Sequence, residues 1–227
     1  MKKLIVLVLF ALISIKTYSQ ATLYVGENFM NNYRNVVINT SKNSYGENIT
    51  GSPFTTDDFV FGKVIGYKNN YLLRYDAFNE QMLAKRKDDK IFIVNKETIT
   101  EVTFNDGTKY VVFDYTFDGI KKNGYLEVLM SNSAISLLKK EVIKFRPAQK
   151  PATGYDQPKP PAFVKARDRY LISNTMGEIN SFNKKKDFLQ LFPDKKNDIE
   201  KFIKSNKIKF TKEKDLIRLV EHINSSL

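Results

Sequence analysis

The stretch that decides the fold begins with Phe59-Val60-Phe61-Gly62-Lys63-Val64-Ile65-Gly66-Tyr67 and continues, after Asn69-Asn70, with Tyr71-Leu72-Leu73-Arg74-Tyr75. Apolar residues alternate with polar ones in these short segments, as they do in half-buried strands. Asn-Asn tolerates the positive φ angles of a tight turn, so the two segments are expected to pair as a hairpin. Similar segments, separated by polar turns, continue to Phe145 and predict an antiparallel meander.

Further strands of this meander are expected at 78–85, 91–94, 98–104, 109–113, 125–130 and 135–145. Asp106-Gly107 is the strongest hairpin signal in the chain. Asp118-Gly119 and Asn123-Gly124 are expected to bracket a loop before the strand at 125–130. Locally joined strands of this kind predict an antiparallel sheet that is curled toward a barrel or folded into a sandwich.

The region after the meander contains a proline-rich stretch and then a helical end. Prolines 147, 151, 158, 160 and 161 exclude a central strand, so 147–162 is either a linker or a long exposed loop inside a hairpin. Residues 163–172 regain strand character and are able to pair with 141–145. Three short amphipathic helices are expected next: 184–192, one that begins at Pro193, and one with Thr211 as its N-cap. The predicted class is α+β, with a β-rich domain at 20–146 and a strand or hairpin plus a basic helical subdomain at 163–227.

The N-terminus has the layout of a secretory signal peptide at 1–19. Lys2-Lys3 precedes the apolar run Leu4–Ile15, and the small residues Thr17 and Ser19 stand at positions −3 and −1 of a cut before Gln20. The apolar run has 12 residues, fewer than the roughly 20 that a membrane-spanning helix needs. No cysteine follows the cut, so a lipoprotein anchor is excluded. The mature chain is expected to be soluble in the periplasm or outside the cell, without a transmembrane span.

Positive charge is concentrated in the C-terminal third. The chain has 37 Lys and Arg residues and 25 Asp and Glu residues; without Lys2, Lys3 and Lys16 the basic residues number 34 and the net charge is +9. Residues 20–144 hold 16 basic and 15 acidic residues, whereas 145–227 hold 18 and 10, a net charge of +8. Such an asymmetry indicates either an anionic partner, such as membrane head groups or polysaccharide, or a lysine-rich solvated surface.

The residue types exclude several chemistries. The absence of cysteine excludes disulfides, thiolate nucleophiles and cysteine metal sites. His222 is the sole histidine, which excludes paired-imidazole metal sites and suggests a role near a helix end. Ser136-Leu137-Leu138-Lys139 matches the S-x-x-K signature of serine acyl-enzymes, but the S-D-N and K-T-G companions are missing and Ser136 is expected in a strand.

Carboxylates are the remaining candidates for catalysis. Asp57-Asp58, Asp88-Asp89, Asp114 and Asp118 are of the right type for two-carboxylate hydrolysis, yet all are expected at strand ends or turns, where Asp is common. Asp114 and Asp118 lack the ligand spacing of a calcium loop. No nucleotide-binding glycine motif or serine elbow occurs in the sequence. We therefore predict no catalytic, cofactor or metal residues, and nucleic acid is not expected as a partner.

Three runs of the sequence carry a resemblance to other proteins: Tyr71-Leu72-Leu73-Arg74-Tyr75-Asp76, Ser136-Leu137-Leu138-Lys139-Lys140 and the end of the chain from Phe188-Leu189-Gln190-Leu191-Phe192-Pro193 onward. On these runs the chain resembles secreted proteins of unassigned activity that are common in flavobacteria and related Bacteroidetes. The resemblance covers most of the mature chain. It implies a periplasmic or extracellular location and no particular reaction.

These observations lead to three functional hypotheses. The first is an exported, non-enzymatic binding or interaction module of the cell envelope, whose partner is an envelope protein or an anionic surface that contacts the basic C-terminal helices. The second is a carrier that holds a lipid or another apolar ligand in the curled sheet. The third is a two-carboxylate hydrolase.

Overall fold

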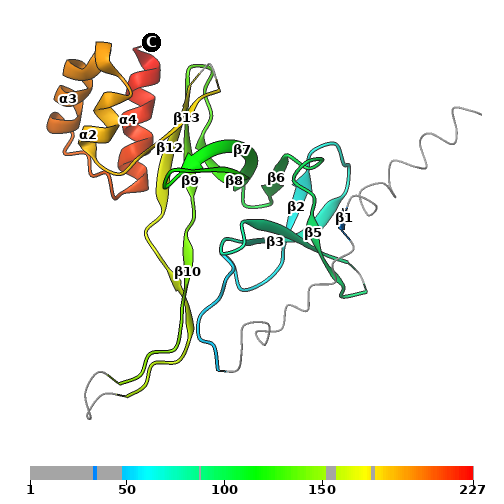
Figure 1. Cartoon of the computed structure of the whole chain (residues 1–227). Helices are drawn as coiled ribbons and strands as arrows, with labels where there is room; N and C mark the ends of the chain where they lie inside the picture. Colours follow the sequence, from blue (N-terminus) through cyan, green and yellow to red (C-terminus); the bar gives the residue numbers. More distant parts are fainter. Residues whose placement is uncertain (1–32, 35–47, 87, 152–156, 175–176, 227) are drawn as a thin grey trace, which may run out of the picture.

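The computed structural model describes residues 33–34, 48–86, 88–151, 157–174 and 177–226, and these form an α+β fold (Figure 1). An 11-stranded antiparallel sheet runs in the order β1-β5-β4-β3-β2-β6-β7-β8-β9-β12-β13, and β10 and β11 form a separate two-stranded sheet. Three α-helices lie at the C-terminal end of the described chain. The predicted class, a curled antiparallel sheet followed by short helices, is confirmed. The predicted signal peptide lies outside the described residues.

The strands are β1 (Tyr33–Arg34), β2 (Val60–Val64), β3 (Asn70–Asp76), β4 (Gln81–Lys85), β5 (Ile91–Val94), β6 (Glu101–Phe104), β7 (Lys109–Phe117), β8 (Ile120–Met130), β9 (Ile135–Lys140), β10 (Ile143–Arg146), β11 (Ala162–Lys165), β12 (Arg169–Asn174) and β13 (Ile179–Phe182). The helices are α2 (Lys185–Gln190), the 3₁₀ turn η2 (Pro193–Lys195), α3 (Lys196–Ser205) and α4 (Glu213–Ser225).

Both expected hairpins are present, but the position of the first turn was predicted wrongly. β2 pairs antiparallel with β3 across residues 65–69, where Gly66 has a φ of 80°, and Asn70 already lies in β3. β6 pairs with β7 across Asp106-Gly107, where Gly107 has a φ of 91° and the Asp106 carboxylate accepts a hydrogen bond from the Thr108 amide. A positive φ at glycine is what a tight hairpin turn requires.

The prediction of a loop between Asp118-Gly119 and Asn123-Gly124 is wrong. Only Asp118-Gly119 forms a turn, with φ angles of 48° and 81°, and β8 runs without interruption through Asn123-Gly124. The reason is tertiary: a Cβ on Gly124 would lie 3.1 Å from Glu80 Oε2 and 3.3 Å from the Tyr115 hydroxyl. Because Gly124 has no side chain, the Glu80 carboxylate can pack directly against the strand. Close approach of another group is a common reason for a glycine inside a strand.

Two further expectations differ from the structure. The segment 135–145 is not one strand, because it divides into β9, which pairs with β12, and β10, which pairs with β11. Thr211 is not the N-cap of the last helix, since α4 begins after the extended residue Lys212. The carboxylate of Asp215, in the first turn of α4, instead accepts a hydrogen bond from the Lys209 amide. β13 was not expected, and it completes the sheet beside β12.

The proline-rich stretch belongs to an arm that projects from the body of the molecule (Figure 1). β10 and β11 pair at the base of the arm, and Gln149 and Lys159 exchange backbone hydrogen bonds of 2.9 and 3.0 Å farther out. Beyond the arm the chain rejoins the main sheet, because β12 pairs with β9. The sheet therefore continues from residues before the prolines to residues after them.

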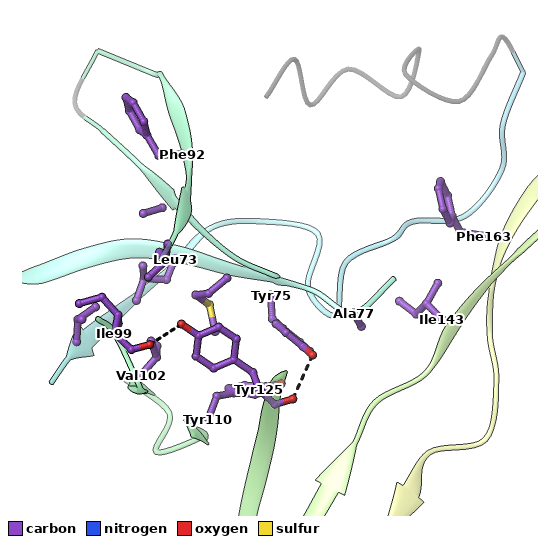
Figure 2. Packing of buried hydrophobic residues seen from close by; sticks show 14 of the residues in the cluster. Leu73, Tyr75, Ala77, Phe92, Ile99, Val102, Tyr110, Tyr125, Ile143 and Phe163 are labelled. Carbon is purple, nitrogen blue, oxygen red and sulfur yellow. Dashed lines mark hydrogen bonds between the residues drawn. The ribbon is translucent and has the colours of Figure 1, made fainter. Parts of the chain in front are cut away.

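The core has two main parts. In the N-terminal half of the sheet, Tyr75 and Tyr125 are 1 % exposed and sit among aliphatic residues; the Tyr125 hydroxyl donates to the Ile99 carbonyl at 2.9 Å (Figure 2). In the C-terminal half, the helices cover one face of β9, β12 and β13. On the other face β13 comes back against β7, so this part of the sheet curls into a half-barrel.

Candidate functional site

The three α-helices present their apolar sides to the sheet and to one another. Phe188 of α2, Ile199 of α3 and Leu216 of α4 are at most 1 % exposed and belong to one cluster with Leu137 of β9. This burial is what the apolar spacing of the sequence predicts. The lysines of α2 and α3 consequently face outward, between and beside the two helices.

Two adjoining hollows lie between α2, η2 and α3, and together we call them the lysine groove. The first has a volume of about 730 Å³ and is lined by Lys185, Lys186, Leu189, Gln190, Pro193, Lys196 and Glu200. The second has a volume of about 650 Å³ and is lined by Lys185, Asn197, Glu200, Lys201 and Lys204. Lys185 and Glu200 line both hollows, so they stand where the two hollows meet.

Positive charge dominates the lysine groove. Five lysines and one glutamate line it, a formal charge of +4. Lys185 pairs with Glu200 at 2.5 Å, and the hydrogen bond from this lysine lowers the pKa of the Glu200 carboxyl. The other four lysines are exposed and form no ion pair with any described residue. They are Lys186, Lys196, Lys201 and Lys204.

The α3 residues of the groove form one continuous stripe on the helix. At 100° per residue, Lys196, Glu200, Lys204, Asn197 and Lys201 follow one another over an arc of about 140°. The buried residues Ile199 and Ile203 lie outside this arc. The basic helical subdomain was predicted from the charge count alone, without individual residues. On a helix whose apolar face is known, the spacing of Lys196, Lys201 and Lys204, which lie 5 and 3 residues apart, was the signal that would have placed these three lysines on one polar side.

The carboxylates considered for hydrolysis remain at separate turns with local partners. Asp88 pairs with Arg86 and Lys90, at 2.8 and 3.3 Å, and Asp89 pairs with Lys85 at 2.8 Å. Asp57 and Asp58 are exposed beside Arg74. Burial lowers the pKa of Arg74, and the negative charge of these two carboxylates offsets that effect only in part. None of these contacts brings carboxylates from two of the predicted pairs together.

The two aspartates of the β7–β8 hairpin are also apart. Asp114 accepts a hydrogen bond from Asn123 at 2.8 Å, whereas Asp118 lies 3.8 Å from Arg169. Roughly 10 Å of extended strand separates Asp114 from the turn that carries Asp118. Among the residues that the structure describes, no three His, Asp or Glu side chains are grouped to hold a metal ion.

Ser136 and Lys139 do not form an acyl-enzyme pair. Both lie in β9, and residues three apart on a strand point to opposite faces. The Ser136 hydroxyl donates to the Asn132 carbonyl at 3.4 Å, while Lys139 pairs with Glu127 at 2.6 Å and with Glu213 at 3.1 Å. The serine therefore lacks the neighbouring lysine that the signature requires.

His222 lies in the last turns of α4, near the predicted helix end. Its ring stacks on Phe202 of α3, with ring centres 3.9 Å apart and planes 7° from parallel, and it lies 3.3 Å from Asp198. These contacts join α4 to α3.

A second polar cluster connects the two halves of the sheet. Glu80 accepts from Lys122 at 2.5 Å, from Lys140 at 3.0 Å and from the Tyr115 hydroxyl at 3.1 Å. Lys96 donates to the Asn123 carbonyl at 2.9 Å. Because the ionised groups of this cluster are paired within the protein, it is suited to holding the fold together more than to binding a ligand.

The pKa values in this cluster show which charge is the better stabilised. Burial acts to raise the pKa of Glu80, but the hydrogen bonds from Lys122 and Lys140 outweigh it and the pKa is lowered. Burial lowers the pKa of Lys140, and Glu80 only partly opposes this. The difference arises because Glu80 has two lysine partners, whereas Lys140 shares one carboxylate and is 3 % exposed.

The inner face of the half-barrel is filled by side chains of the protein. Leu126, Leu138 and Leu171 are fully buried there, next to Tyr115. The hypothesis of an apolar ligand inside the curled sheet thus gains no support from the described strands. Over the described residues, no helix has the length and apolar character to cross a membrane.

Comparison of the chain with protein-family models, with curated proteins and with solved structures found no match. The resemblance to secreted flavobacterial proteins remains a prediction, and the lysine groove is the strongest candidate site on the chain's own residues.

Proposed function

We propose that this protein is an exported, non-enzymatic binding module of the cell envelope, and that it binds an anionic partner in the lysine groove. Export is supported by the N-terminal signal-peptide pattern. The observation that supports binding most directly is the presence of four exposed, unpaired lysines around one concave surface. A concavity lined by one sign of charge concentrates counter-ions and attracts ligands of the opposite charge.

The distribution of charge favours this function over a lysine-rich solvated surface. The groove holds +4 of the +8 that residues 145–227 carry. At the start of α4, in contrast, lysine alternates with acids in Glu213-Lys214-Asp215, although Lys207, Lys209 and Lys212 in the preceding loop have no acid between them. Mixed signs are typical of a surface adapted to solubility. The groove departs from that pattern.

Binding of the exported protein to anionic vesicles and to anionic polysaccharides, measured at several salt concentrations, tests the proposal. We expect affinity that falls steeply as salt rises, because exposed charges are screened within about 10 Å at 0.1 M salt. Replacing Lys186, Lys201 and Lys204 by glutamine is expected to reduce affinity about tenfold to a hundredfold, at roughly 0.5 to 1 kcal/mol for each lost contact.

The matched control replaces three exposed lysines outside the groove, Lys63, Lys68 and Lys144, by glutamine. It removes the same net charge and is expected to keep most of the affinity. Equal losses in both triple variants, or no binding to any anionic material, would overturn the proposal. Turnover of an envelope substrate that a single carboxylate substitution abolishes would overturn its non-enzymatic part.

A further inference from the structure

We infer that the ligand of the lysine groove is a linear anionic polysaccharide and not a membrane surface. The inference rests on the proposed function, because it names the class of partner that the same groove binds. Three features of the groove support it: its length, the burial of its aliphatic residue Leu189 and the side-chain amides that line it.

The length of the groove fits a chain better than a small anion. Its α3 wall extends from Lys196 to Lys204, which is about 12 Å at 1.5 Å per residue. The Lys185–Glu200 ion pair divides this length into two hollows, and exposed lysines stand on both sides of it. A single phosphate or carboxylate occupies only one of the hollows, whereas a polymer with repeated anionic groups passes through both.

The helices lack the surface that a membrane-binding element uses. Helices that lie on a bilayer insert an exposed apolar face. In the described chain the large exposed hydrophobic residues are Phe61, Ile65, Ile120 and Val164, and none of them belongs to α2, α3 or α4. Leu189, the aliphatic residue of the groove, is 5 % exposed. A flat bilayer is also poorly matched to lysines that surround a concavity.

The neutral polar residues of the groove indicate a sugar polymer. Each hollow contains one exposed side-chain amide, Gln190 in the first and Asn197 in the second. An amide both donates and accepts hydrogen bonds, which suits hydroxyl groups, whereas an ammonium only donates. A polysaccharide presents hydroxyl groups and anionic groups in alternation along one chain, and the exposed ring of Pro193 offers a surface for the apolar face of a sugar.

The experiment compares three probes on the exported protein: a linear polyuronate, a sulfated polysaccharide and vesicles of anionic and zwitterionic phospholipid. We expect a polysaccharide to bind more tightly than the vesicles at equal salt. Affinity for its oligomers should rise with length until the groove is spanned and then change little. The double variant Gln190→Ala/Asn197→Ala keeps all charges, and it should lose about tenfold in polysaccharide affinity while vesicle binding is unchanged.

The outcomes separate the inference from the proposed function. Binding to vesicles without binding to either polysaccharide overturns the inference and leaves the proposed function intact. Polysaccharide binding that the double amide variant does not weaken also overturns the inference, because charge alone then explains affinity. No binding to any probe overturns both.

Discussion

The carboxylate of Glu80 lies 3.0 Å from the ammonium group of Lys140, and this ion pair joins the two halves of the sheet. Glu80 precedes β4, in the N-terminal half, whereas Lys140 ends β9 in the half-barrel. Lys140 is only 3 % exposed, and its ammonium group lies 5.7 and 5.3 Å from the rings of Tyr115 and Phe117. The half-barrel that supports the helices is therefore connected to the rest of the sheet through a buried charge.

Removal of the acid from this pair should destabilise the protein more than removal of the buried base. In Glu80→Gln, Lys140 loses its carboxylate inside the protein, and we expect a loss of about 3 kcal/mol in the free energy of unfolding. In Lys140→Met, Glu80 keeps Lys122 and Tyr115, so the change should stay within about 1 kcal/mol. Urea unfolding measures both. An equal loss in the two variants, or a larger loss for Lys140→Met, would show that the carboxylate is not the shared centre of the cluster.

The same carboxylate predicts a dependence on pH. Because the pKa of Glu80 is lowered in the folded protein, its charge stabilises the fold above the unfolded pKa of about 4.3 and this contribution disappears as pH falls through the lowered value. The difference in unfolding free energy between the wild type and Glu80→Gln should be constant between about pH 7 and 5 and should shrink below about pH 4.3.

Tyr125→Phe serves as the control in this titration, because it removes no carboxylate. Its difference from the wild type should stay constant over the same acidic range. A difference for Glu80→Gln that is equally constant down to pH 3 would contradict the assigned role of the carboxylate.

Local patterns predicted those parts of the fold that depend on neighbours in sequence. The Asp106-Gly107 hairpin and the apolar stripes of the helices follow from turn chemistry and from periodicity, and both are present. Asn123-Gly124 has the same local signature as a hairpin turn. Asn123-Gly124 nevertheless lies inside β8. Its placement there depends on Glu80, which is distant in the sequence and contacts Lys122, 42 positions away.

The lysine groove likewise could not be predicted from local sequence patterns. Counting charges located the basic region, but a concave surface exists only once α2 and α3 are packed side by side. That arrangement depends on contacts between residues of different helices, such as the ion pair of Lys185 in α2 with Glu200 in α3 and the shared apolar cluster of Phe188 and Ile199. The length of the groove and the amides Gln190 and Asn197 were accessible only from the structure.

The base of the projecting arm should depend on Gly51. This glycine has a φ of 74°, and a Cβ there would lie 2.2 Å from the Phe163 carbonyl oxygen. Thr50, beside it, donates to Pro161 at 3.1 Å and accepts from the Phe163 amide at 2.9 Å. We expect Gly51→Ala to lower the unfolding free energy by about 3 kcal/mol, because backbone strain and a backbone clash combine. Hydrogen exchange at the Phe163 amide should accelerate.

The matched variant for this prediction is Gly119→Ala. Gly119 has a similar φ of 81°, but no atom lies within 4 Å of an added Cβ. Its loss should be about 1 to 2 kcal/mol, from the left-handed backbone alone, with unchanged exchange at Phe163. Equal losses at the two glycines would mean that the segment at Thr50 does not pack on the arm as closely as the structure shows.

The hydroxyl of Tyr110 should contribute more to stability than that of Tyr125. Tyr110 donates to the Glu141 carboxylate at 2.5 Å, and the other ionic partner of Glu141 among the described residues is Lys165 at 3.8 Å. Burial raises the pKa of Tyr110, and Glu141 raises it further, so the tyrosine stays protonated and remains a donor. Tyr110→Phe should lower the unfolding free energy by about 2 kcal/mol, since hydrogen bonds to charged groups contribute about 1.5 to 3 kcal/mol.

Tyr125→Phe removes a hydrogen bond of similar burial whose acceptor is the neutral carbonyl of Ile99. Its loss should be closer to about 1 kcal/mol. A double-mutant cycle of Tyr110→Phe with Glu141→Gln isolates the interaction of the pair, and we expect a coupling above about 1 kcal/mol. Because Glu141 directly precedes the arm, a coupling near zero would indicate that the arm is held to the sheet by other contacts, such as that of Phe78 with Phe163.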